Sequence, residues 1–259
     1  MSYTKEQLQE LQNQLIHYLR PSTNPVAIKY CRTEEELKSI PNVEYFQQPA
    51  AYVCNAIAIP SYFNKTVAVR GCDCEFDYCA ICNGLQPRNE KWNQGGYMCE
   101  YPFKWFATQE DSLKHTEARK PYCPENIYAI VSSTLERGDI TDPDVVCISL
   151  LPGAAFFLLS GLLHRDYQKI DFSFVGESTC ADTWNRTYLS GKPGLSLGCR
   201  GDRGGAALAS DEVRVTLTMQ DFEKAVNGVV SLYGDGFPNG INYPIYPVGS
   251  YPMALLPKQ

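Results

Sequence analysis

The sequence predicts an α/β (or α+β) domain with a mixed β-sheet flanked by helices, and three observations support this prediction. Segments with apolar residues at helical spacing alternate along the chain with short runs rich in Val and Ile. The chain has 259 residues, 44% of them hydrophobic, which is enough to bury a large core. No long polar linker and no internal repeat divides it. We therefore expect a single domain over residues 1–259.

The first segment is predicted to be an amphipathic helix. Thr4 and Gln7 have the spacing of a capping box, leucines follow at helical spacing, and Pro21 ends the element. The next predicted elements are a strand at 25–30, a short helix at 34–40, a mostly apolar element at 49–63 and a strand at 65–71.

Residues 71–125 are rich in cysteine and aromatic residues, and we expect them to form an elaboration within the domain. Regular structure then resumes. Strands are predicted near 127–133, 144–150, 170–175 and 212–218, and helices at 154–164, from Ser178, and from Met219 to about Val230. Residues 234–259 contain a proline every few positions, which predicts an extended Pro/Tyr-rich tail.

The stretch Val145–Leu163 is nineteen residues long and carries no charge, so its length and composition resemble those of a membrane span. Pro152-Gly153 divides it into a run rich in Val, Ile and Leu and a helical half, which favours a buried strand, a turn and a helix. We therefore expect no membrane association.

Charge and composition exclude several functions. The net charge of −6 and the pI of about 5.2 disfavour binding to nucleic acid or to an anionic membrane. The polar N-terminal helix lacks the apolar core and cleavage site of an export signal, which predicts a cytoplasmic protein. Thiols stay reduced in the cytoplasm, so the eleven cysteines point to metal binding or catalysis more than to disulfides.

The stretch RGCDCEFDYCAICNG, residues 70–84, holds Cys72, Cys74, Cys79 and Cys82. Two sulfurs in a C-x2-C spacing can face one centre, and alternate residues of an extended C-x-C segment share a face. Thiolates are soft ligands for zinc and for iron–sulfur clusters, and clusters accept compact, irregular spacing. We favour a metal or cluster here; free packed thiols and a redox disulfide are the alternatives.

Three remote cysteines, Cys54, Cys180 and Cys199, are candidates for further ligands. Cys180 lies near a predicted helix start and Cys199 in the glycine-rich GCRGDRGG, two settings that favour the thiolate. Positive charge beside Cys199 adds to this effect and favours an anionic substrate group. We therefore predict catalytic roles for Cys180, Cys199, Arg200 and Arg203.

The glycines of GCRGDRGG have two interpretations. Gly198 and Gly201 could bring backbone N–H groups around an anion or a cluster sulfide, or they could form a tight turn before the next strand. The segment is not a dinucleotide fingerprint, because a G-x-G-x-x-G pattern is absent and we expect a strand to follow it. The other cysteines, Cys31, Cys99, Cys123 and Cys147, are expected to be structural.

Several motifs occur in a fixed order: NPVAIKY, AYVC, CAICNGL, PDVVCISLLPGAAFFLLSGLL, a cysteine near 180, and GKPGLSLGCRGDRGG followed by DEVRVTLT. Together they resemble the Domain of Unknown Function 169 family, which is found widely in anaerobic bacteria and archaea. The resemblance covers most of residues 20–230. It implies one α/β domain with recurring cysteines matched here by Cys54, Cys79 or Cys82, Cys180 and Cys199. Cys72, Cys74, the aromatic insertion and the tail depart from that pattern.

These observations lead to one main expectation and two alternatives. The main expectation is a cytoplasmic iron–sulfur protein, with a 4Fe–4S cluster, that serves anaerobic metabolism as a redox enzyme or enzyme partner. It would act on a small molecule or an electron-transfer partner. The alternatives are a binding or scaffold protein with a structural zinc, and a metal-free thiol oxidoreductase that uses Cys79 and Cys82. The sequence leaves open whether the chain forms a homo-oligomer and whether it is an enzyme, such as an oxidoreductase or a lyase.

Overall fold

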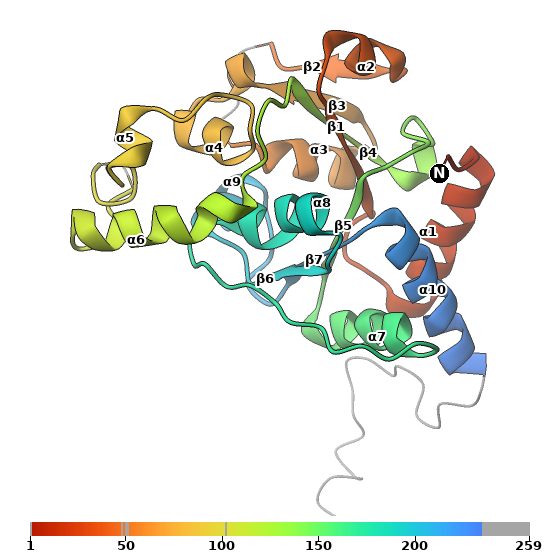
Figure 1. The fold of residues 1–259 in the computed structure, drawn as a ribbon. Helices are drawn as coiled ribbons and strands as arrows, with labels where there is room; N and C mark the ends of the chain where they lie inside the picture. Colours follow the sequence, from red (N-terminus) through yellow and green to blue (C-terminus); the bar gives the residue numbers. More distant parts are fainter. Residues whose placement is uncertain (1, 48, 50–51, 102, 235–259) are drawn as a thin grey trace, which may run out of the picture.

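The computed structural model describes residues 2–47, 49, 52–101 and 103–234, and it has an α/β fold built on a mixed sheet (Figure 1). Seven strands form the sheet among these residues. They are β1 (Val26–Cys31), β2 (Val43–Tyr45), β3 (Thr66–Arg70), β4 (Ala129–Thr134), β5 (Val145–Leu150), β6 (Gly194–Ser196) and β7 (Val213–Leu217). Their order is β2-β3-β4-β1-β5-β7-β6, and only the β2–β3 pair is parallel.

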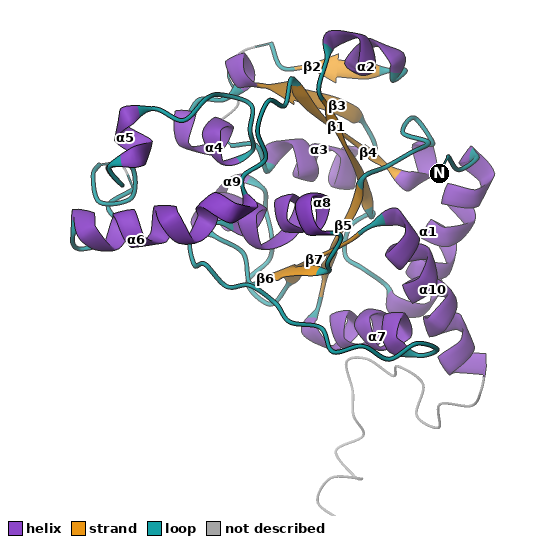
Figure 2. Ribbon diagram, viewed as in Figure 1, coloured by secondary structure: helices purple, strands orange, loops and turns teal. Residues whose placement is uncertain are grey.

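Helices cover both faces of this sheet, which passes between them in Figure 2. The longer ones are α1 (Lys5–Leu19), α3 (Asn55–Phe63), α6 (Gln109–Arg119), α7 (Pro152–Leu163) and α10 (Met219–Gly234). The shorter ones are α2 (Glu34–Ser39), α4 (Asp77–Cys82), α5 (Glu90–Asn93), α8 (Arg186–Ser190) and α9 (Arg200–Gly205). The predicted class, a mixed sheet flanked by helices, is therefore confirmed.

The alternation of side chains along the strands creates two cores. In β1, Ala27 and Cys31 face a core that α1, α7 and α10 complete. Val26, Ile28 and Tyr30 point the other way, into a core shared with α3. Because both faces are covered, the central strands β1, β4 and β5 are almost entirely buried.

Most predicted elements are present. Thr4 and Gln7 form the expected capping box of α1. The apolar stretch 145–163 becomes β5 and α7, with Pro152 at the first position of the helix. Within the part of the chain that the structure describes, no helix is long and apolar enough to cross a bilayer.

The predicted strand at 170–175 was wrong, because this segment is irregular and Phe172 and Phe174 are exposed. Local polar contacts replace a strand ladder there: the Val175 N–H donates to Asp182, and the Asp171 carbonyl accepts from Arg186. The predicted tail lies outside the described residues from 235 onward.

The elaboration at 71–125 contains a helix that the sequence pattern did not predict, α6. Its buried side chains are polar, namely Ser112, His115, Thr116 and Arg119, so apolar periodicity could not reveal it. The segment has a small core of its own, in which Trp92 and Met98 are fully buried beside Tyr78 and Cys82. This core lies against the α3 side of the sheet (Figure 1).

Helices α7 and α10 cross with their backbones in contact. A Cβ atom added at Gly228 would lie 2.0 Å from the carbonyl oxygen of Gly161, and one at Gly161 would lie 2.4 Å from the carbonyl oxygen of Ala225. Glycine is required at this crossing because no side-chain atom fits between the two helices.

We expect Gly228→Ala to destabilise the fold by about 1–3 kcal/mol, because the new methyl group forces α7 and α10 apart. This cost outweighs the gain of about 1 kcal/mol that alanine has over glycine inside a helix. Urea denaturation followed by circular dichroism measures it. The control is Asn227→Ala at the exposed neighbouring position, which should change stability little; equal stability of both variants would contradict the close crossing.

Candidate functional site

Five cysteines from four separate chain segments line one pocket on the α3 side of the sheet. They are Cys54, Cys79, Cys82, Cys180 and Cys199. All eleven cysteines of the chain are free thiols in the structure. The remaining wall is largely aromatic and apolar, with Tyr52, Tyr78, Met98, Phe103 and Trp184 among its side chains. The site is therefore rich in sulfur and poor in water-binding groups.

Each of these cysteines lies in or beside a helix. Cys54 directly precedes α3, and Cys199 is the N-cap residue of α9. Cys79 and Cys82 both belong to α4. Cys180 precedes a kinked π-helical turn, Ala181–Asn185, which continues into α8.

Side-chain hydrogen bonds fix α4 against the turn that follows Cys180. Trp184 Nε1 donates to Asn83 Oδ1 at 2.9 Å, and Asn83 Nδ2 donates to the carbonyl oxygen of Cys79 at 2.8 Å. Asn185 Nδ2 donates to the carbonyl oxygen of Cys82 at 2.9 Å. These three amide and indole groups are buried, so each needs the partner it has. They bring the C-x2-C turn next to Cys180.

The sulfur of Cys82 is the centre of the cluster of thiols. Its Sγ lies 3.3 Å from the Sγ of Cys180, 3.9 Å from that of Cys123 and 3.5 Å from the hydroxyl of Ser178. Arg119 Nη1 lies 4.0 Å away. Hydrogen bonds donated by Cys123 and Cys180 hold the pKa of Cys82 well below its usual range, and the positive charge of Arg119 adds to this effect.

The other thiols of the pocket favour the protonated form. Burial is the main cause that raises the pKa values of Cys54, Cys79 and Cys199, while Cys180 is raised first by its hydrogen bond to Cys82. The pocket therefore holds one thiol that favours the thiolate, surrounded by neutral donors.

Polar groups at the pocket come from the segment before Cys180. Burial raises the pKa of Glu177, whose Oε1 accepts the backbone N–H of Arg200 at 2.8 Å. Thr179 Oγ1 accepts the backbone N–H of Cys199 at 2.7 Å. The carboxyl of Glu177 therefore holds a proton more readily than an exposed glutamate does.

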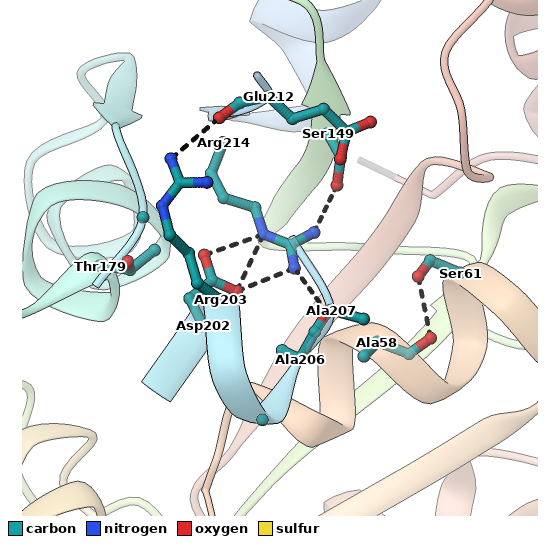
Figure 3. A network of polar contacts seen from close by, with 12 residues as sticks. Ala58, Ser61, Ser149, Thr179, Asp202, Arg203, Ala206, Ala207, Glu212 and Arg214 are labelled. Carbon is teal, nitrogen blue, oxygen red and sulfur yellow. Dashed lines mark hydrogen bonds and ion pairs between the residues drawn. The ribbon is translucent and has the colours of Figure 1, made fainter. Parts of the chain in front are cut away.

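The glycine-rich segment forms the short helix α9 before β7, whereas we expected β7 to follow directly. Asp202 of this helix is fully buried and forms an ion pair with Arg214 of β7 at 2.8 Å, and Arg214 also donates to Ser149 Oγ (Figure 3). This pair joins the helix that begins after Cys199 to β7, the strand between β5 and the edge strand β6.

Two predicted site residues have evident structural roles. Arg203 donates to the backbone carbonyls of Leu197, Ala209 and Glu212, and Figure 3 shows the contact with Glu212. Arg203 is not part of the pocket wall, whereas Arg200 is. Gly198 has a φ of +86°, a conformation that glycine adopts without strain.

Tyr52 lies against α9, where glycines make room for its ring. A Cβ atom added at Gly205 would lie 2.4 Å from Cδ2 of Tyr52, and one at Gly201 would lie 3.1 Å from Cδ1. Gly201 also lines the pocket. The glycines of this motif therefore allow an aromatic wall to pack directly on the helix.

The run of four cysteines at 72–82 is divided by the fold. Cys79 and Cys82 line the pocket, but Cys72 is exposed and Cys74 donates a hydrogen bond to the carbonyl oxygen of Arg70 at 3.5 Å. Neither Cys72 nor Cys74 belongs to the pocket wall. Cys123, which we expected to be only structural, contacts Cys82.

Sequence reasoning missed the importance of Arg119, Cys123 and Tyr52. Arg119 occurs in the charged stretch KHTEARK, which is typical of an exposed helix. Tyr52 precedes Cys54 by two residues, and only the glycines opposite it could have indicated its position.

Whether a metal or cluster fits the pocket depends on how the thiols are grouped and on the space between them. Among the residues that the structure describes, no three His, Cys, Asp or Glu side chains are grouped to hold a metal ion. The cavity that the pocket residues line has a volume of about 50 Å³, which is room for only a few water molecules. An inorganic cluster would therefore require some thiols to turn away from the positions they have here. The thiols themselves are soft donors, which suit an iron–sulfur cluster.

Comparisons with known proteins identify relatives without a described function. A family model described as "Uncharacterised ArCR" matches residues 14–228. The "Uncharacterized protein MJ0308" of Methanocaldococcus jannaschii is 29% identical over 121 residues, which is 46% of this chain and 52% of that protein. The match thus spans about half the length of this curated relative. No solved structure matches the chain.

Neighbouring glycines of α9 provide a matched test of the pocket wall. We expect Gly205→Ala to destabilise the protein by about 1–3 kcal/mol and to displace Tyr52, because the methyl group overlaps its ring. Gly204→Ala should be neutral or slightly stabilising, because a Cβ atom there meets nothing within 4 Å. Urea denaturation measures stability, and crystal structures of the two variants show the position of the ring. Equal behaviour of the two variants would show that Tyr52 does not pack on α9.

Proposed function

The chain belongs to the Domain of Unknown Function 169 (DUF169) family, and we propose that it is an iron–sulfur protein whose pocket thiols hold the cluster. The observation that carries this proposal is the convergence of five cysteines from four segments on one pocket. Buried cysteines also occur singly as small apolar residues, but packing alone gives no reason for five to meet.

The chemistry of the donors supports a cluster over a hard metal ion. Thiolates are the preferred ligands of iron–sulfur centres and of zinc, and the aromatic wall keeps water away from them. We assign the ligands to the set Cys54, Cys79, Cys82, Cys180 and Cys199. A 4Fe–4S cluster takes four thiolates, so this set contains one thiol more than a fully ligated cluster needs.

The remaining polar residues have roles that follow from their positions. Arg200 is exposed at the pocket and can bind an anionic group of a small molecule. Glu177, with its raised pKa, can hold or donate a proton beside it. A bound cluster would supply electrons. If only three thiolates held it, one iron atom would keep a coordination position free for a small molecule. Eleven free thiols also favour a reducing compartment such as the cytoplasm.

Iron and acid-labile sulfide in protein purified without oxygen test this proposal. We expect both, together with broad visible absorption. Cys82→Ala and Cys180→Ala should reduce iron affinity by more than the about 10–100-fold that loss of an outer-shell partner typically causes. Each substitution removes a sulfur from the centre of the pocket.

Cys72→Ala and Cys74→Ala are the matched controls, because both cysteines lie outside the pocket wall. They should keep the wild-type iron content. Loss of iron in these two variants, with iron retained in Cys82→Ala, would place the centre elsewhere. Stoichiometric zinc without sulfide would replace the cluster by a zinc site, and a colourless protein with neither metal would remove the proposal.

A metal-free thiol oxidoreductase is the second candidate, and one distance favours it. The Sγ atoms of Cys82 and Cys180 are 3.3 Å apart, and Cys82 is the thiol that favours the thiolate. Its sulfur would attack a disulfide substrate and release one thiolate. Cys180, after losing its proton, would then attack Cys82 and release the second thiol, leaving a Cys82–Cys180 disulfide. The expected pair is thus Cys82 with Cys180, in place of the Cys79/Cys82 pair of the sequence motif.

Mass spectrometry after treatment of the metal-free protein with a small disulfide separates the candidates. We expect a Cys82–Cys180 crosslink, because these are the nearest thiols of the pocket, and in Cys180→Ala a mixed disulfide that stays on Cys82. A crosslink between Cys79 and Cys82 would support the sequence motif instead. No reaction at any pocket cysteine would exclude this second candidate.

A further inference from the structure

Arg119 is a fully buried cation at the edge of the sulfur site. It belongs to α6 in the elaboration, and none of its surface is exposed to solvent. Its guanidinium carbon lies 4.3 Å from the ring centre of Tyr78 and 4.6 Å from that of Trp92. The two aromatic faces hold the group in place and attract its charge.

No carboxylate forms an ion pair with Arg119 within the described part of the chain, which is unusual for a buried arginine. Its Nε and Nη2 atoms have no hydrogen-bond partner, and Nη1 points to the sulfur of Cys82 at 4.0 Å. A buried charge without a counter-charge is strongly unfavourable. The geometry therefore indicates that the sulfur atoms beside Arg119 supply the negative charge that balances it.

The other titratable neighbours do not neutralise the positive charge of Arg119. His115 is buried on the same helix, and burial together with the nearby guanidinium lowers its pKa to about 3, so it is neutral. Glu177 is close enough for Arg119 to act on its pKa, but burial, which raises that pKa, is the larger effect. The other groups that act on the arginine are the hydroxyl of Tyr78, which burial keeps protonated, and the thiols of Cys82, Cys123 and Cys180.

We propose that Arg119 is the buried positive partner of the sulfur site and that it makes the group held by these thiols easier to reduce. This inference rests on the proposed function. Reduction adds negative charge, and a fixed positive charge in a dry site stabilises the more negative state. Net charge and hydrogen bonds to sulfur are the means by which proteins set the potentials of iron–sulfur centres. Arg119 is thus a positioning and tuning residue that need not touch a substrate.

The experiment compares reduction potentials of the cluster in the wild type and in Arg119→Gln, by spectroelectrochemistry of protein prepared without oxygen. We expect the equilibrium constant for reduction to fall at least tenfold, which is about 59 mV for a one-electron couple. Arg119→Lys keeps the charge and should recover most of this loss. Lys120→Gln, which removes the exposed charge of the next residue, should leave the potential unchanged.

Arg119→Met guards against a folding failure, because its unbranched apolar chain fills the space between Tyr78 and Trp92 without a charge. A potential that stays at the wild-type value in either neutral variant overturns the inference. Iron content is measured on the same samples, so loss of the proposed cluster and loss of the charge effect are read separately.

A metal-free readout tests Arg119 even if the wild type holds no cluster. Reduced wild-type protein is treated with anionic iodoacetate and with neutral iodoacetamide, and alkylation of each cysteine is followed by mass spectrometry. The same measurement is made on Arg119→Gln. A positive partner favours the anionic reagent, so we expect the iodoacetate-to-iodoacetamide rate ratio at Cys82 to be several-fold higher in the wild type than in Arg119→Gln, with the ratio at exposed Cys72 unchanged. An equal ratio at Cys82 in the two proteins overturns the inference, and absence of iron overturns only the proposed function.

Discussion

The ion pair between Asp202 and Arg214 determines where the sulfur site can form. Both side chains are buried, and the guanidinium of Arg214 also donates hydrogen bonds to Ser149 and to the carbonyl oxygen of Ala206. Separating such a pair would leave an uncompensated charge in the interior, at a typical cost of about 3–5 kcal/mol. The pair therefore fixes α9 on the sheet, and α9 begins directly after Cys199. The position of α9 therefore sets where the thiol of Cys199 lies. It also sets the position of the Tyr52 ring, which packs on this helix.

The elaboration completes the site from the opposite side. Its small core holds Tyr78 and Trp92 around Arg119, and the same core includes Cys82 and Cys123. The sheet and α3 supply Cys54, whereas this extra layer supplies the cation that faces Cys82. Two hydrophobic clusters with different partners thus meet at one group of thiols. The elaboration thus supplies the buried cation beside Cys82, while Glu177 and Arg200 at the pocket come from the segments before Cys180 and after Cys199.

The sequence predicted the framework well because periodicity reports on burial. The strands in 25–30 and 144–150 and the helix at 154–164 were recognisable from their apolar patterns, and the capping box of α1 from two side chains. Helix α6 was missed because it buries polar residues, and the strand at 170–175 was wrong because its alternating residues face solvent. Local pattern carries no information about which side chains a remote element will cover.

The same limit applies to the site. The sequence could identify Cys54, Cys180 and Cys199 as candidates, but it grouped Cys72 and Cys74 with Cys79 and Cys82 because they are neighbours in the chain. The turn after β3 leaves Cys72 exposed and places Cys74 outside the pocket wall, whereas helix α4 brings Cys79 and Cys82 into it. The role of Arg119 depends on tertiary packing alone, since its sequence context is that of an exposed charged helix. Since the pocket draws thiols from four segments between residue 54 and residue 199, any ligand that bridges them joins parts that lie far apart in the chain into one cooperative unit. Such a ligand would hold the four segments in place together, and its release would loosen them together.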